Sequence, residues 1–283
     1  MTLVGWLSAL AVGLLAGAVS GLVGIGGGAI MVPFLYFFLG QPDLSGLIVP
    51  ANQQAVMAHA TSLLVIVPIS LRGAWLYRRE GLVEWRAVWR MGLASVFTAV
   101  VGARVAIVAP GQLLKVAFGI FLLVIAARLL KGKARGESEA KPTTEGARAG
   151  RAIAGGAAVG FFSALLGVGG GLVAIPVLIY ALHTPMRKVS GTSLALITFT
   201  ALTGVAAYAA SGLLVQSGSG AISTYFHLPA AFALAAGAMV GVPLGTGTQL
   251  RLPTHSLRWL FAVVFLVLGL RIAVVNLLNL LRG

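Results

Sequence analysis

The sequence predicts an all-α polytopic membrane protein built from two inverted repeats of about five hydrophobic segments each. Three observations lead to this fold class. The chain of 283 residues is 59% hydrophobic and only 9% charged, whereas soluble domains carry about 25% charged residues. Apolar runs close to the ~20 residues that cross a bilayer recur along the whole chain. A glycine-rich decapeptide also occurs twice, at matching places in two hydrophobic halves.

The two decapeptides, at 24–33 and 167–176, share the pattern GxGGG-x4-P and lie 143 positions apart. The same offset relates Ser20 to Ser163, Pro110 to Pro253, and Arg128 to Arg271. Thr61-Ser62 matches Thr192-Ser193 at an offset of 131, because the first half carries extra residues near 41–52. Matches that recur in order predict a first repeat over 1–130 and a second over 152–283, joined by a cytoplasmic linker over 131–151.

Hydrophobic periodicity places the segments in chain order. We expect them near 3–23, 28–40, 55–71, 87–109 and 111–130, and again near 152–168, 171–182, 189–209, 227–250 and 255–281. An odd number in the first repeat inverts the second repeat relative to it. Residues 28–40 and 171–182 are too short to cross a bilayer upright. Each glycine cluster is therefore predicted to be the turn of a broken or re-entrant helical hairpin.

The positive charges set the predicted orientation. A net charge of +14 would suggest nucleic acid in a soluble protein, but in a membrane protein basic residues gather in cytoplasmic loops. Most of them form four groups: Arg72, Arg78, Arg79, Arg86 and Arg90; Arg128, Lys131, Lys133, Arg135, Lys141, Arg148 and Arg151; Arg187 and Lys188; Arg251 and Arg258. Placing these groups inside predicts a multi-pass protein of the inner (cell) membrane, with the N-terminus outside and no nucleic-acid partner. Lys115 and Arg282 fit this scheme poorly.

The acidic residues and the absent cysteines limit the chemistry. All six acidic residues lie in predicted loops or at segment ends: Asp43, Glu80, Glu84, Glu137, Glu139 and Glu145. Cation transporters normally need carboxylates inside the membrane, so the pattern favours an anionic solute, or at least a neutral one. With no Cys there is no disulfide and no thiolate metal site. The spans also lack paired acids and Cys-His sets, so we expect no enzyme, no cofactor and no metal.

The glycine turns are the first candidate binding site. A helix that begins at Gly28 or at Gly171 would expose N–H groups without an intrahelical partner, at the positive end of its dipole. Such helix ends attract anions. The alternative is that these glycines only allow close helix packing. The candidate substrate-binding residues of the turns are Gly24, Gly26, Gly27, Gly28, Pro33, Gly167, Gly169, Gly170, Gly171 and Pro176.

Polar residues of the third segment in each half are the second candidate group: His59, Thr61, Ser62, Ser190, Thr192 and Ser193. Their hydroxyls could surround an oxyanion, or they could bond to carbonyls of their own helix. His59 could carry a coupling proton or pair with an anion, or it could be a neutral histidine bonded between helices. Arg104, in the fourth segment, could bind an anion or snorkel to the outer interface.

The duplicated GxGGG-x4-P motif, followed in each half by a Thr-Ser segment, resembles the TauE/SafE family of membrane permeases over nearly the whole chain. Members are associated with export or uptake of sulfite, sulfoacetate, other organosulfonates and related anions. The resemblance implies a small sulfur-containing anion as the substrate. The repeats with their broken helices predict a secondary transporter that works by alternating access, with protons as a candidate coupling ion at His59. Export is favoured, because an inside-negative potential drives anions outward. An anion channel and a transporter of small carboxylates or other anions remain the alternatives.

Overall fold

A computed structural model describes residues 1–131, 145–215 and 225–249, together with 266, 267, 269, 270, 272 and 274. Helices account for the regular structure of this part of the chain. The first half contains α1 Leu3–Val23, α2 Gly28–Leu39, α3 Pro42–Ser45, α4 Ala51–Arg79, α5 Trp85–Val108 and α6 Gly111–Lys131. The second half contains α7 Glu145–Leu166, α8 Gly171–Pro176, the π-helix Val177–Ala181, α9 Met186–Val215 and α10 Leu228–Gln249. The predicted all-α class is confirmed.

Within the described ranges, six helices are long and apolar enough to cross a membrane: α1, α4, α5, α7, α9 and α10. Helix α2 has 12 residues and is about 18 Å long at 1.5 Å per residue, well short of the ~30 Å hydrocarbon core. The apolar stretch Gly171–Ala181 is similarly short. Nine of the predicted segments thus appear as helices, and 255–281 lies almost wholly outside the described residues.

Some boundaries differ from the prediction. Helix α7 begins at Glu145, within the segment predicted as linker. Two ion pairs hold this start of α7 against α5: Arg90 to Glu145 at 3.2 Å and Arg148 to Glu84 at 3.1 Å. The loop near 41–52 contains the short helix α3, whose proline lies in the first turn, where a missing N–H costs nothing. The repeat matches at Pro253 and Arg271 lie outside the described residues.

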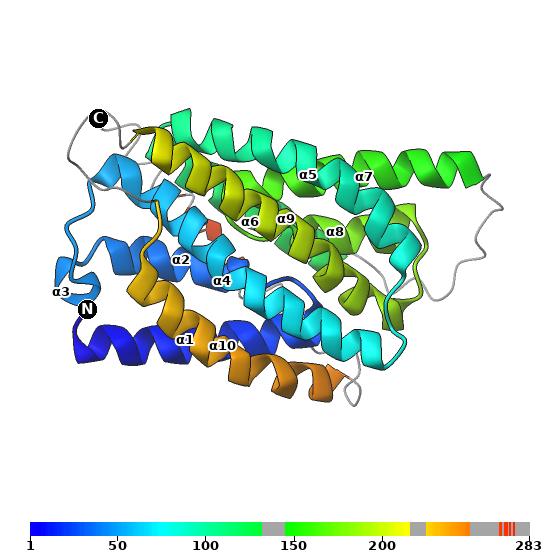
Figure 1. The fold of residues 1–283 in the computed structure, drawn as a ribbon, viewed down its shortest axis with the longest axis horizontal. Coiled ribbons are helices and arrows are strands. Elements are labelled where there is room, and N and C mark those ends of the chain that lie inside the picture. The colour runs from blue at the N-terminus through cyan, green and yellow to red at the C-terminus, as the bar shows by residue number, and fades with distance from the viewer. Residues whose placement is uncertain are drawn as a thin grey trace.

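The two halves are interleaved, because the long helices pair across them. Helix α1 packs along α10, α5 along α7, and α4 against α9 (Figure 1). Small residues permit the close approach, as in other membrane helix pairs. A Cβ atom on Gly13 of α1 would lie 2.1 Å from the Leu234 carbonyl oxygen of α10, and one on Gly156 of α7 would lie 2.2 Å from the Met91 carbonyl oxygen of α5.

These two contacts are related by the offset of 143, with the roles of the halves exchanged. A second pair of equivalent contacts joins the long helices α4 and α9 to α1 and α7, the helices that precede the glycine turns. The Tyr77 hydroxyl donates to the Gly21 carbonyl at 2.6 Å, and the Tyr208 hydroxyl donates to the Ala164 carbonyl at 2.8 Å. Figure 1 shows that α1 and α7 run in opposite directions along the long axis, as do α4 and α9.

Most of the helix ends that carry basic residues lie at one end of the bundle. Helix α4 ends there with Arg78 and Arg79, and α5, α7 and α9 begin there (Figure 1). The N-terminus and α3 lie at the opposite end. Five basic residues that were also predicted to be cytoplasmic, at 133, 135, 141, 251 and 258, lie outside the described residues.

Candidate functional site

Both glycine clusters form tight left-handed turns. The φ angles are 82°, 85° and 79° at Gly24, Gly26 and Gly27 of the first turn, and 66°, 78° and 83° at Gly167, Gly169 and Gly170 of the second. Side chains disfavour this region of backbone conformation, whereas glycine enters it freely. Helices then begin at Gly28 and Gly171, as the sequence predicts.

The two turns meet each other in the interior. A Cβ atom on Gly28 would lie 2.6 Å from the Val168 Cα atom, and one on Gly171 would lie 2.6 Å from the Ile25 Cα atom. Ile25 and Val168 are 2% and 1% exposed. Backbone therefore touches backbone at the contact, and any side chain on either glycine would force the two turns apart.

Each turn also rests on the long helix of the opposite half. A Cβ atom on Gly24 would lie 2.6 Å from the Ser190 Cα atom of α9, and one on Gly167 would lie 2.5 Å from the His59 Cα atom of α4. His59 and Ser190 are equivalent at the offset of 131. The glycines of both turns, His59 and Ser190 are thus brought together around one contact between the halves.

Hydroxyls of α9 bind the first turn. Ser190 Oγ donates to the Val23 carbonyl at 3.0 Å, and Ser193 Oγ donates to the Gly24 carbonyl at 2.6 Å. These partners belong to another element rather than to the serines' own helix. In this conformation both hydroxyls hold the end of α1 and the start of the turn against α9.

The two predicted threonines make equivalent contacts at opposite ends of the bundle. Thr61 Oγ1 accepts the His227 N–H at 2.9 Å, just before α10, and Thr192 Oγ1 accepts the Glu84 N–H at 2.9 Å, just before α5. Glu84 and His227 are themselves related by the offset of 143. Each threonine therefore anchors the first residues of a helix from the other half.

The equivalent polar residues of α4 are left with unused hydrogen-bonding groups. Ser62 is fully buried, and its hydroxyl has no hydrogen-bond partner among the described residues, although its equivalent Ser193 is bonded. His59 Nε2 is hydrogen-bonded to the Tyr36 hydroxyl. Its Nδ1 approaches the Leu165 carbonyl without the geometry of a hydrogen bond.

Two more buried hydroxyls adjoin the turns. Ser20 and Ser163 are fully buried, and their hydroxyls form no hydrogen bond with any described residue. Gly24 donates its N–H to the Ser20 carbonyl at 2.7 Å, and a Cβ atom on Gly170 would lie 3.2 Å from the Ser163 Cβ atom. In the sequence, this serine pair served only to align the repeats. Because a serine recurs at the same distance before both glycine clusters, the sequence alone could have indicated these two residues as candidate binding residues.

The prolines of the motif modify the short helices. Pro33 lies inside α2 and Pro176 ends α8, where the π-helix begins. A proline has no N–H to offer the carbonyl four residues earlier, which is that of Ala29 or Leu172. Each short helix thus has incomplete backbone bonding at its start and in its first turns.

The local electrostatics suit a negative ligand. Gly27 and Gly170 provide no side-chain cap for α2 and α8, so the first N–H groups keep the positive end of the helix dipole unneutralised. The described acidic residues, Asp43, Glu80, Glu84 and Glu145, lie in or beside the ends of helices. The described part of the chain contains no group of His, Cys, Asp and Glu that could hold a metal ion.

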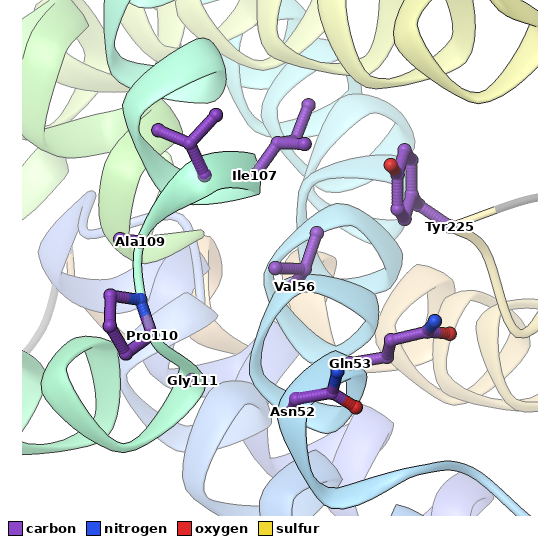
Figure 2. Close-up of a pocket in the computed structure, with 9 residues that line it drawn as sticks. Asn52, Gln53, Val56, Ile107, Ala109, Pro110, Gly111 and Tyr225 are labelled. Atoms are coloured by element: carbon purple, nitrogen blue, oxygen red, sulfur yellow. The ribbon is translucent and has the colours of Figure 1, made fainter. Parts of the chain in front are cut away.

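A cavity of about 350 Å³ lies away from the turns, at the end where α4 begins and α5 joins α6. Asn52, Gln53, Val56 and Tyr225 line it together with 107–111, and Figure 2 shows the polar ends of Asn52 and Gln53 beside it. None of the predicted site residues lines this cavity. The glycines of both turns are buried, and this cavity lies apart from them at one end of the bundle.

Comparison with known proteins gives consistent results. The model of the family "Sulfite exporter TauE/SafE" matches residues 9–272. The "Probable membrane transporter protein YunE" of Bacillus subtilis is 28% identical over 271 residues, which cover 91% of this chain and 93% of the relative. The "Probable membrane transporter protein MJ0441" of Methanocaldococcus jannaschii is 27% identical over 271 residues, covering 92% of each chain. No solved structure matches the chain.

Proposed function

The chain belongs to the TauE/SafE family of membrane transporters, and from this membership we propose that it is a secondary transporter of a small sulfur-containing anion such as sulfite or an organosulfonate. The anion binds at the two glycine turns. Alternating access exposes the turns to one side of the membrane and then to the other. The glycines of both turns are buried in the conformation described above, so we assign that conformation to an occluded state.

The observation that carries the proposal is the set of unsatisfied polar groups around the turns. The Ser20, Ser62 and Ser163 hydroxyls are buried without a hydrogen-bond partner among the described residues. A buried polar group without a partner costs about 1–3 kcal/mol, and a hydroxyl can donate to an oxyanion. Together with the uncapped starts of α2 and α8, these groups supply donors from both halves. No described carboxylate lies at the turns to repel the ligand.

The repeat architecture supports the alternating-access part of the proposal. We propose that the halves are inverted repeats related by a two-fold axis in the membrane plane. The exchanged contacts of Gly24 with Ser190 and of Gly167 with His59 are what such an axis would produce. Two inverted repeats can exchange their conformations. The protein then opens to one side of the membrane or to the other, around a binding site near the midplane.

The orientation follows the distribution of basic residues. We propose that the end of the bundle where α4 finishes and α5, α7 and α9 begin is cytoplasmic, because Arg78, Arg79 and other basic residues lie there. In the inner membrane, the linker that precedes α7 then lies on the cytoplasmic side, and the N-terminus lies on the outer side. The end with α3 and the cavity of Figure 2 is the outer end.

The charge of the substrate favours export. An inside-negative potential contributes about 2.3 kcal/mol per charge per 100 mV to outward movement of an anion, so export needs no coupling ion. Uptake would need a co-ion, and His59 is the histidine that lies at the turns and could carry a proton. We therefore propose electrogenic export, with proton coupling at His59 reserved for inward transport.

The test is flux through purified protein in proteoliposomes, with sulfite, sulfate, thiosulfate, taurine, sulfoacetate and small carboxylates compared side by side. The proposal expects saturable flux of at least one sulfur-containing anion and accelerated exchange of labelled for unlabelled anion. Flux that does not saturate and shows no exchange would identify an anion channel. Flux of carboxylates alone would remove the sulfur specificity.

A further inference from the structure

We propose that Lys115 is an outer anion site, at which the transported anion binds between the outer surface and the glycine turns. This inference rests on the proposed function and adds a cationic residue to it. The site consists of the Lys115 ammonium, the Gln54 amide and the Tyr36 ring, one residue from each of α6, α4 and α2. It lies outside the candidate set that the sequence analysis identified.

The position of Lys115 is unusual for a cation in a membrane protein. Lys115 is half-buried and lies one turn inside α6, about 6 Å from its first residue. That helix start is packed on the start of α4, since a Cβ atom on Gly111 would lie 2.9 Å from the Asn52 carbonyl oxygen. Ionisable residues within membrane helices are costly and generally serve a function.

Among the described residues, Lys115 has polar contacts but no counter-ion. Its ammonium donates to Gln54 Oε1 at 3.3 Å and lies 5.5 Å from the centre of the Tyr36 ring. The ion pairs formed among the described residues are those of Arg90 and Arg148, at the other end of the bundle. A neutral amide and an aromatic face compensate a buried charge only in part. An anion bound from solution would supply the counter-ion that Lys115 lacks among the described residues.

A continuous series of contacts connects Lys115 with the turns. The Tyr36 ring lies beside the Lys115 ammonium, and the Tyr36 hydroxyl is hydrogen-bonded to His59 Nε2. The backbone of His59 in turn lies against Gly167 of the second turn. An anion leaving the turns toward the outer end therefore meets Lys115 as the nearest described cation along this series.

The partners of Lys115 occur in one half only. At the equivalent positions the second half keeps a cation, Arg258 for Lys115, but has Pro185 for Gln54, Ile179 for Tyr36 and Ser190 for His59. The contacts of the two halves are otherwise exchanged in pairs, so this difference sets the outer route apart from the inner one. A cation on the outer route lowers the energy of an anion moving outward, in the direction proposed for transport.

The experiment measures the concentration dependence of sulfite flux in proteoliposomes for Lys115→Gln, Lys115→Arg and Gln54→Glu. Lys115→Gln removes the charge, and Gln54→Glu keeps it but places a carboxylate beside it. Both changes are expected to raise KM about tenfold, the equivalent of one ion-pair contact of about 1.4 kcal/mol. Lys115→Arg is expected to restore KM to within about threefold of the unchanged protein.

Arg104→Gln is the matched control. Arg104 is exposed near the end of α5, as expected for a cation that snorkels to the interface rather than binds an anion. The change therefore removes the same charge from the surface and is expected to leave KM unchanged. Folded Lys115→Gln and Gln54→Glu proteins with unchanged KM would overturn the inference alone, as would an equal effect of Arg104→Gln. Absence of saturable sulfite flux in the unchanged protein would overturn the sulfite proposal and this inference together.

Discussion

Gly24 lies directly against the backbone of Ser190, so closely that a Cβ atom on the glycine would come within 2.6 Å of the serine Cα atom. Gly167 has the same relationship to His59, at 2.5 Å. Each turn is therefore seated on the long helix of the opposite half, and the glycine is required both for its φ angle and for this contact.

Replacing Gly24 or Gly167 by Ala is expected to destabilise the protein by more than about 3 kcal/mol, because the positive φ and the backbone clash act together. Gly81→Ala separates the two effects, since Gly81 has a φ of 69° and no atom within 4 Å of an added Cβ. It is expected to cost about 1 kcal/mol. Thermal unfolding in detergent measures all three, and equal costs would show that the contact with α9 or α4 is unimportant.

The serines at equivalent positions are expected to respond differently to substitution. Ser193→Ala removes the 2.6 Å bond to the Gly24 carbonyl and leaves a buried acceptor unpaired, which costs about 1 kcal/mol or more. Ser62→Ala removes a hydroxyl that has no hydrogen-bond partner among the described residues, so little stability is lost. The unfolding midpoints of the two variants provide the comparison. A larger loss from Ser62→Ala than from Ser193→Ala contradicts the assignment of Ser62 to the substrate.

The paired tyrosines test the proposed two-fold relation. Tyr77→Phe and Tyr208→Phe each remove one buried hydroxyl donor, from the Gly21 and the Ala164 carbonyl. Each change is expected to cost about 1 kcal/mol, and the two costs should agree because the environments are equivalent. Chemical denaturation in mixed micelles would measure them. A several-fold difference between the two would argue against the equivalence of the halves.

Titration of His227 is expected to set the response of stability to acid at the end of the bundle that carries α3. Its Nδ1 accepts the Ala230 N–H at 3.1 Å, so Nε2 carries the proton and donates to the Ser45 carbonyl at 3.1 Å. Burial lowers the pKa of His227 below its ordinary value of 6.5, and the positive N-terminus acts in the same direction. Protonation therefore favours the unfolded state. The contribution of His227 to stability is complete above pH 6.5 and declines as the pH falls from there toward the lowered pKa.

The comparison for this prediction is His227→Asn, which keeps an acceptor for the start of α10 but does not titrate. Between pH 8 and pH 5, the unfolding temperature of the unchanged protein is expected to fall further than that of the variant. Parallel curves for the two proteins would show that His227 remains neutral in both states or is not linked to folding.

Sequence reasoning located the turns well, because glycine pattern and local conformation are directly linked. The starts of α2 at Gly28 and α8 at Gly171 were predicted to the residue. The start of α7 was not, because ion pairs with α5, a long-range feature, hold it. The π-helix Val177–Ala181 and the short α3 have no periodic signal of their own.

The site was predicted less completely than the fold. Thr61 and Thr192 were expected to face a ligand, and they accept N–H groups from segments that only the tertiary structure brings near. Ser62 and Ser193 occupy equivalent positions, yet among the described residues only the Ser193 hydroxyl has a hydrogen-bond partner. Lys115 disagreed with the charge pattern, and that disagreement was the sequence-level indication of its unusual environment.

The central claim is that hydroxyls beside the two glycine turns bind the anion. Equilibrium binding of radiolabelled sulfite to purified protein tests it most directly, with Ser20→Ala/Ser163→Ala compared with Ser70→Ala, whose buried hydroxyl bonds to the Val67 carbonyl of its own helix at 3.0 Å. The account predicts one saturable site in the unchanged protein, at least about tenfold weaker binding in the double variant, and unchanged binding in Ser70→Ala. Undiminished sulfite affinity in a folded double variant would contradict the account.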